Sequence, residues 1–225
     1  MQLTKYTHAC VRLDDGDRKL VIDPGIFSEV DQALDGVEAV LITHEHVDHI
    51  DAERLQAAAK ANSRLRVWAP AAVADSLDSL GEQVVAVGAG ESFDAGGFAV
   101  RTFGGQHALI HPSIPVVANV GYLVNGGAPG NDGAAAGGGV YHPGDSFTVP
   151  TEPVTTLLAP LHAPWSKTAE VIDFVIAVRA PKVHQVHDSL LTDVGRGFVQ
   201  AHLARIGAEH GSEYSYLAPG STVTA

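Results

Sequence analysis

One short stretch of the chain gathers residues that can bind metal. Histidines and an aspartate follow an apolar run in Leu41-Ile42-Thr43-His44-Glu45-His46-Val47-Asp48-His49-Ile50. If residues 38–43 form a buried strand, its extended continuation places His44 and His46 on one face, because side chains two apart in a strand point the same way. Asp48 and His49 follow where the chain turns into a helix, so they can reach a second ion beside the first. The motif therefore predicts half of a two-metal site.

A solvated surface cluster of histidines is the alternative explanation of the same residues. The apolar strand before the motif and the helical pattern after it both disfavour this alternative. A chance match also remains a risk for any short motif, so the rest of the chain has to supply the missing ligands.

The order Thr-His-x-His-x-Asp-His after an apolar strand resembles the signature of the metallo-β-lactamase-fold hydrolases. The resemblance continues upstream through Asp23-Pro24-Gly25, and downstream through His107, Gly144-Asp145-Ser146 and His187-Asp188. It covers nearly the whole chain and is greatest to the small UlaG-like branch, which has a short N-terminal hairpin and no added domain. The resemblance implies an α/β fold (α+β in some schemes), built as a four-layer αββα sandwich.

The resemblance also implies a ligand set for two divalent ions. It gives His44, His46 and His107 to the first ion, Asp48, His49 and His187 to the second, and Asp145 to both as a bridge. A set made only of nitrogen and oxygen donors suits zinc, manganese or iron, and zinc is our first expectation. Asp23 is expected to support the site from behind, with an ordinary turn aspartate as the alternative.

The expected reaction is hydrolysis of a small ester, lactone or phosphodiester by a metal-bound hydroxide. Two cations make a bound water nucleophilic near neutral pH and stabilise the oxygen that leaves. Asp145 stands where zinc-dependent class B β-lactamases commonly offer a cysteine, so antibiotic cleavage is not expected. A thioester hydrolase of the glyoxalase II kind is the alternative enzyme, disfavoured because no C-terminal helical domain follows. A non-catalytic metal-binding protein of the same fold is the alternative from another class, disfavoured by the complete set of seven ligands.

Two further residues are expected to act on the substrate directly. Asp48 is expected to be catalytic as well as a ligand. His162 follows the predicted strand 155–161, and an imidazole with a pKa near 6.5 can protonate a leaving group at neutral pH. Its segment, residues 161–165, is alternatively a lid of purely packing residues.

Other histidines and one tryptophan are assigned on position alone. Trp165 is expected to form an apolar wall that holds the substrate. His8 falls where the UlaG-like branch often has a histidine near the site, and we expect it to contact substrate. His111 and His142 either orient ligands or are structural histidines.

Length and composition set the broad class. The chain has 225 residues with 45% hydrophobic content, enough for one substantial core, and we expect a single domain over residues 1–225. A formal net charge of −12 and the absence of a Lys or Arg run exclude nucleic acid as an expected partner. Residues 1–8 lack the apolar core of a signal peptide, and no apolar run reaches the length of a membrane span. A cytoplasmic enzyme with a small-molecule substrate and no membrane partner is therefore expected, while the oligomeric state is not determined.

Strands and helices alternate along both halves, which favours helices packed on sheets. The predicted helices are 52–61, capped by Asp51, then 71–80, 168–179 and 193–206. The predicted strands are 3–7, 9–13, 19–22, 38–43, 64–69, 83–87, 98–103, 116–124, 140–142, 155–161, 182–186, 214–217 and 222–223, with the last two closing the second half. Residues 126–139 contain seven glycines and predict a mobile hairpin tip.

Overall fold

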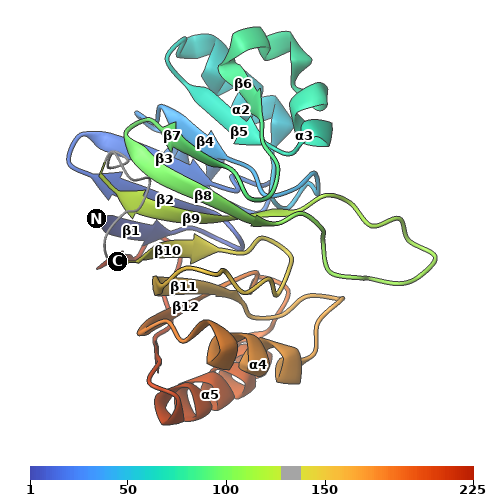
Figure 1. Ribbon diagram of the computed structural model, residues 1–225, viewed down its shortest axis with the longest axis vertical. Helices are drawn as coiled ribbons and strands as arrows, with labels where there is room; N and C mark the ends of the chain where they lie inside the picture. The colour runs from blue at the N-terminus through green and yellow to red at the C-terminus, as the bar shows by residue number, and fades with distance from the viewer. Residues whose placement is uncertain (128–137) are drawn as a thin grey trace.

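The computed structural model describes residues 1–127 and 138–225. Two sheets pack face to face, and helices cover the outer surface of each sheet (Figure 1). The strand order is β14-β1-β2-β3-β4-β5-β6 in the first sheet and β13-β12-β11-β10-β9-β8-β7 in the second. This is the αββα sandwich that the sequence predicts. The predicted hairpin tip falls largely on residues 128–137, which lie outside the described residues.

The first sheet comes from the N-terminal half of the chain and one C-terminal strand. Its strands are β1 (Gln2–Lys5), β2 (Val11–Asp15), β3 (Arg18–Ile22), β4 (Ala39–Leu41), β5 (Arg66–Ala69), β6 (Val84–Ala86) and β14 (Thr222–Thr224). Pairing is antiparallel from β14 to β3 and parallel from β3 to β6.

The placement of β14 corrects one prediction. Residues 222–223 were expected to close the second half, whereas Val223 lies opposite Leu3 in the first sheet. The open edge of β1 has unpaired backbone groups, and the returning chain satisfies them. Two further hydrogen bonds extend this pairing, from Gly220 N to Lys5 O at 2.7 Å and from Lys5 N to Ser221 O at 3.0 Å. Such pairing between distant segments leaves no local pattern to detect.

The second sheet contains one strand that is not among those predicted from the sequence. Its strands are β7 (Ser92–Ala95), β8 (Phe98–Gly104), β9 (Val120–Gly126), β10 (Gly139–His142), β11 (Val154–Pro160), β12 (Lys182–Val186) and β13 (Glu213–Tyr214). The missed strand is β7, which forms a hairpin with β8 through Gly96 and Gly97. Both glycines have positive φ, at 62° and 88°. A Gly-Gly pair is a hairpin signal, so this strand was detectable.

The helices match the predictions in position more closely than in length. They are α1 (Val30–Ala33), which was not predicted, α2 (Ala52–Ala61), α3 (Ala71–Ser76), the 3₁₀ helix η1 (Asp78–Gln83), α4 (Thr168–Val178) and α5 (Asp193–Glu209). Asp51 caps α2 as predicted, and its side chain accepts a hydrogen bond from Arg54 N. The predicted helix 71–80 ends early and continues as η1. Within the described part of the chain, every helix is too short or too polar to cross a bilayer.

Three apolar cores hold the four layers together. The central core lies between the sheets, and one further core lies between each sheet and its helices. Strand β4 shows how one element serves two cores: Ala39 and Leu41 face the other sheet, while Val40 faces the helices. This follows from the alternation of side chains along a strand. Strand β4 lies in the first sheet, and β10 and β12 lie on either side of β11 in the second. The residues that follow these three strands form much of the site described next.

Candidate metal centre

Asp23 fixes the turn from which the histidine motif starts. Asp23 is fully buried directly after β3, the neighbour of β4. Its carboxylate accepts hydrogen bonds from the backbone N–H and the hydroxyl of Thr43 at 2.8 and 2.7 Å. It also accepts one from Nδ1 of His49 at 2.7 Å. Asp23 thus supports the site from behind, in the position expected for it.

The first cluster brings together four ligand-type residues from three separate segments. These are His44, His46, His107 and Asp145, whose ligand atoms lie within 4.8 Å of one another. His44 Nε2 lies 3.1 Å from His46 Nδ1, and His107 Nε2 lies 3.3 Å from Asp145 Oδ2. The residues expected to hold the first ion and its bridge are therefore gathered at one place.

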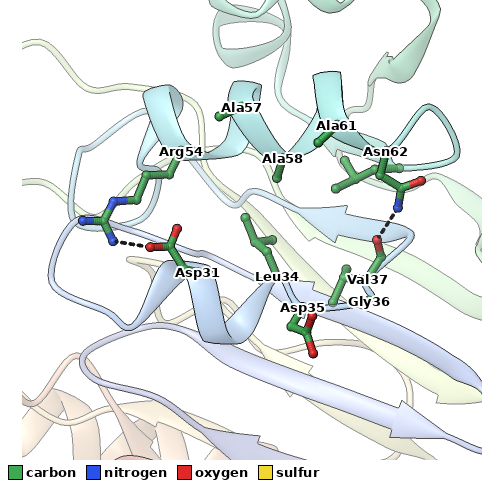
Figure 2. Close-up of a pocket in the computed structure, with 11 residues that line it drawn as sticks. Asp31, Leu34, Asp35, Gly36, Val37, Arg54, Ala57, Ala58, Ala61 and Asn62 are labelled. Atoms are coloured by element: carbon green, nitrogen blue, oxygen red, sulfur yellow. Dashed lines mark hydrogen bonds and ion pairs between the residues drawn. The ribbon is translucent and has the colours of Figure 1, made fainter.

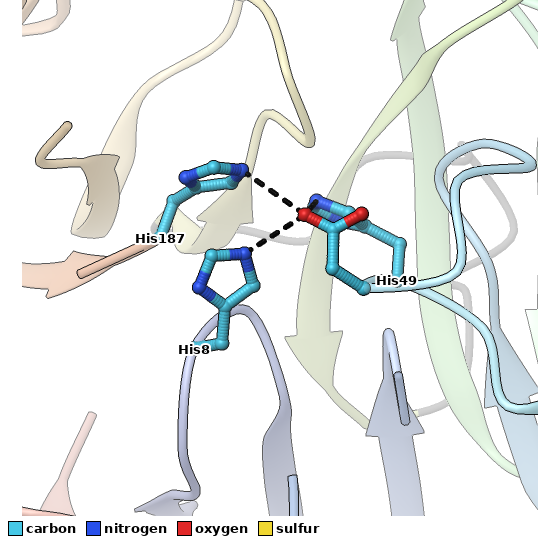
Figure 3. Close-up of side chains that lie close together, drawn as sticks. His8, His49 and His187 are labelled. Carbon is cyan, nitrogen blue, oxygen red and sulfur yellow. Dashed lines mark hydrogen bonds and ion pairs between the residues drawn. The ribbon is translucent and has the colours of Figure 1, made fainter. Parts of the chain in front are cut away.

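The second cluster lies beside the first. Its members are His8, Asp48, His49 and His187, again with ligand atoms within 4.8 Å (Figure 3). Asp48 Oδ2 lies 3.0 Å from His8 Nε2 and 3.5 Å from His187 Nε2. Asp145 connects the two clusters, because its carboxylate oxygens also lie 3.0 Å from His49 Nε2 and 3.2 Å from His187 Nε2.

His8 has a different place from the one expected. It was assigned to substrate, but its side chain has 0% exposure and faces the carboxylate of Asp48. It lies in the turn between β1 and β2 with φ of 64°, and its ring is 4.0 Å from that of His187, centroid to centroid. The resemblance places His8 near the site, but no local pattern connects it to Asp48, 40 residues further along the chain, so its grouping with the second cluster is not predicted.

In five of the clustered histidines, the outer ring nitrogen, which is the Nδ1 atom that faces away from the centre, is hydrogen-bonded to a protein oxygen. In His44 and His8, Nδ1 is hydrogen-bonded to a hydroxyl, Thr43 Oγ1 at 3.0 Å and Ser189 Oγ at 2.7 Å. In His107 and His187, Nδ1 is bonded to a backbone carbonyl, that of Ala108 at 2.6 Å and that of His162 at 2.8 Å. In His49, Nδ1 is bonded to the carboxylate of Asp23 at 2.7 Å. Such bonds fix the ring orientation. Where the partner is a carbonyl or a carboxylate, which can only accept, Nδ1 carries the proton, so that Nε2 presents its lone pair to the centre.

Unpartnered atoms provide a test of whether these residues fit metal ions. His49 Nε2, His107 Nε2 and Asp145 Oδ1 are buried and have no hydrogen-bond partner among the described residues. A buried polar atom without a partner costs about 1–3 kcal/mol. All three atoms point into the same small region, and divalent cations would satisfy them. The donor set, which is entirely nitrogen and oxygen, suits two such ions.

The carboxylates keep their negative charge in this buried setting. Burial alone would raise the pKa of Asp145, but attraction to His49 and the close approach of His107 and His187 hold it well below its ordinary value. Burial would likewise lower the pKa of His187, yet Asp145 and Asp48 outweigh it and raise that pKa to about 9. The centre therefore attracts positive charge, whether protons or metal ions.

A pocket of about 140 Å³ opens onto both clusters. Its floor is formed by His46, Asp48, His107, Asp145 and His187, and its walls by Ile110, Pro164, Trp165 and Leu190. Trp165 lies in the wall, and its Nε1 donates to Asp145 Oδ2 at 3.0 Å. Its contact with substrate stays a prediction. His162 is half-buried and is not one of the residues that line this pocket. The contact that links His162 to the centre is its backbone carbonyl.

A second pocket, between α1 and α2, has none of this chemistry. It has a volume of about 340 Å³ and is lined mainly by alanines and aliphatic side chains (Figure 2). Asp31 and Arg54 form a 3.5 Å ion pair at one end. Its lining residues include neither histidine nor cysteine. The larger pocket is therefore not the candidate site.

Comparison with known proteins agrees with the fold and the site. The sequence profile of the β-lactamase superfamily domain matches residues 2–187. The chain is 35% identical over 224 residues to Protein Rv0786c of Mycobacterium tuberculosis, covering 100% of both chains. It is 32% identical over 125 residues to a UPF0173 metal-dependent hydrolase of Xanthobacter autotrophicus, covering 51% of each. Among solved structures it resembles Igni18, a metallo hydrolase of Ignicoccus hospitalis, with a TM-score of 0.74 and 17% identity over 99% of this chain and 97% of that one.

The chain belongs to the β-lactamase superfamily and has the metallo-β-lactamase fold. The predicted superfamily and fold are thus confirmed, and a metal-dependent hydrolase is supported. The matches do not single out the UlaG-like branch, which stays a prediction.

Proposed function

We propose that this protein uses two divalent ions, zinc in the first instance and manganese or iron as alternatives, to hydrolyse a small ester, lactone or phosphodiester. One observation carries the proposal: two clusters of ligand-type residues lie side by side at the floor of one pocket, with Asp145 in contact with both. Seven to eight ligands exceed what a single tetrahedral ion needs.

Each residue of the site has a role in this proposal. His44, His46 and His107 would hold the first ion, Asp48, His49 and His187 would hold the second with His8 beside them, and Asp145 would serve both. When bound, the ions lower the pKa of a water and polarise the substrate. Asp48 lines the pocket and its side chain is 20% exposed, against 4% for Asp145. Asp48 is therefore the carboxylate more accessible to a water in the pocket, and we assign proton transfer to it.

Metal content and hydrolysis together test the proposal. We expect two zinc or manganese ions per chain by elemental analysis of the saturated, dialysed protein. The same protein should cleave at least one of p-nitrophenyl acetate, γ-butyrolactone derivatives and bis(p-nitrophenyl) phosphate, and a chelator should abolish the activity reversibly. One tightly held ion under saturating metal would overturn the dinuclear site. Two bound ions without any hydrolysis across the panel would favour a non-catalytic metal-binding protein.

A further inference from the structure

We infer that the site takes a neutral carboxylic ester or lactone with an extended apolar substituent, and that this substituent lies on an apolar rim around the pocket. The inference rests on the proposed function and narrows its substrate class. The apolar rim consists of Ile26, Phe27, Val47, Leu109, Ile110 and Leu190, which are between 37% and 59% exposed.

The rim residues come from segments that reach the metal clusters. Val47 lies between His46 and Asp48, and its carbonyl accepts the N–H of Ile26 at 2.9 Å. The ring of Phe27 meets that of His8 edge to face at 5.3 Å between centroids. Separate parts of the chain thus expose large apolar side chains beside the same pocket. Scattered exposed apolar residues need no explanation, but several of them on segments that reach one pocket indicate a binding surface.

One long segment contributes a wall of the rim. The chain between β8 and β9 extends away from the body of the molecule (Figure 1). Its base is held near the centre, because His107 N donates to Val117 O at 3.0 Å and Ala108 N donates to Asp145 O at 2.8 Å. Leu109 and Ile110 follow directly, and Ile110 lines the pocket. The segment is therefore positioned by the metal site, with apolar side chains beyond it.

The size of the pocket determines which part of a substrate it can hold. Its volume of about 140 Å³ is well below the roughly 300–1,000 Å³ of pockets that enclose a drug-sized ligand. Only the scissile group and a few atoms fit on the floor beside Asp48 and Asp145. A larger substituent must leave the pocket across the rim, where it meets Leu109 and Leu190.

The described side chains that line the pocket offer no cation to an anionic substituent away from the metal centre. Neither Lys nor Arg is present among the described residues that line it. A phosphate away from the scissile bond would normally be met by Arg or Lys through charge-assisted hydrogen bonds. Here it would instead face the two aspartates and apolar walls. An apolar, uncharged substituent is the chemistry that this surface matches.

Chain-length dependence tests the inference with two independent measurements. For the zinc-loaded protein, we expect kcat/KM for p-nitrophenyl esters to rise about twofold per methylene, roughly 60-fold from acetate to octanoate, because a half-exposed methylene contributes about half as much as a fully buried one. Binding of the carboxylates from acetate to octanoate, measured by calorimetry, should show the same rise without any turnover.

Variants locate the effect on the rim. The double variant Leu109→Asn, Leu190→Asn should reduce both chain-length gradients to less than about fivefold. Val85→Asn is the matched control, because Val85 is 40% exposed on β6 at the far edge of the first sheet and should leave both gradients intact. Light scattering should give the same molar mass for the double variant and the wild type.

The possible outcomes separate this inference from the proposed function. Hydrolysis of short esters with no gradient, or preference for a phosphorylated or phosphodiester substrate, would overturn the inference and leave the metal-dependent hydrolase in place. A change from dimer to monomer in the double variant would make the rim a contact between two copies and also overturn it. No hydrolysis of any ester would count against the proposed function, while the calorimetric gradient alone would still decide whether the rim binds apolar chains.

Discussion

The two metal clusters are supported in different ways. In the first cluster, the outer nitrogens of His44 and His107 are bonded to the residues next to them in sequence, Thr43 and Ala108. In the second cluster, every outer nitrogen is held by a distant segment: that of His8 by Ser189, that of His49 by Asp23, and that of His187 by the carbonyl of His162. Both clusters gather distant segments, but the ring orientations of His44 and His107 depend on neighbours in sequence, whereas those of His8, His49 and His187 depend mainly on tertiary contacts. Substitutions away from the ligands should therefore weaken the second ion more than the first.

The largest effect should come from the residue that the clusters share. Asp145→Ala removes a carboxylate that lies within 3.3 Å of histidines in both clusters. We expect both ions to be lost on dialysis and hydrolysis to fall more than 100-fold, beyond the roughly 10–100-fold that the loss of an outer partner costs. Elemental analysis measures this directly. If one ion stays bound at full stoichiometry, Asp145 does not bridge.

Removing the metal should expose a difference in protonation between the clusters. Burial lowers the pKa values of His44 and His46, whereas Asp145 and its neighbouring carboxylates raise those of His49 and, to about 9, His187. A histidine whose pKa is raised on folding stabilises the protein below its unfolded pKa of about 6.5, and this contribution is lost as pH rises towards 9. The metal-free protein should therefore melt at lower temperature at pH 9 than at pH 6.5.

Two controls belong to that experiment. The metal-loaded protein should lack this fall in melting temperature, because its histidines are already deprotonated by the ions. Far-ultraviolet circular dichroism should show a folded protein without metal, since three apolar cores hold the layers. A chain that unfolds completely on chelation would make the site structural.

A moderate effect is expected from the outer partner of His8. Ser189→Ala removes the hydroxyl that holds Nδ1 of that histidine at 2.7 Å. We expect the affinity for the second ion to fall about tenfold and that for the first to stay unchanged. Ser113→Ala is the matched control, because its hydroxyl bonds His111 Nδ1 at 2.7 Å in an exposed segment. Competition with a chromogenic chelator gives both affinities, and equal losses would remove the distinction between the clusters.

The smallest effect should come from His162. Its carbonyl holds His187, and His162→Ala keeps that carbonyl. We therefore expect unchanged metal content and less than about a threefold change in kcat. The same variant also tests the general-acid role predicted from the sequence. A fall in kcat near 100-fold that is confined to esters with poor leaving groups would establish that role. Comparing p-nitrophenyl and ethyl esters separates the two results.

The same contrast explains what the sequence could and could not predict. The motif from His44 to His49, the cap at Asp51 and the αββα layers depend on local patterns, so they were recoverable. The grouping of His8 with Asp48 and the pairing of β14 with β1 join residues far apart in sequence, and nothing in either segment names its partner. The short helix α1 was missed because a single turn has no period to detect.

The backbone at three site residues has a consequence for which amino acids these positions accept. His8, Asp23 and His187 have φ of 64°, 51° and 54°, a left-handed conformation that costs most side chains about 1–2 kcal/mol. Glycine would relieve the conformational cost but delete the functional atom. β-Branched residues would neither relieve the cost nor supply that atom. Asparagine adopts this conformation more readily than most and keeps a polar oxygen. In a saturation scan of single substitutions, these three positions should tolerate very few replacements, and at Asp23 asparagine should score above both glycine and glutamate.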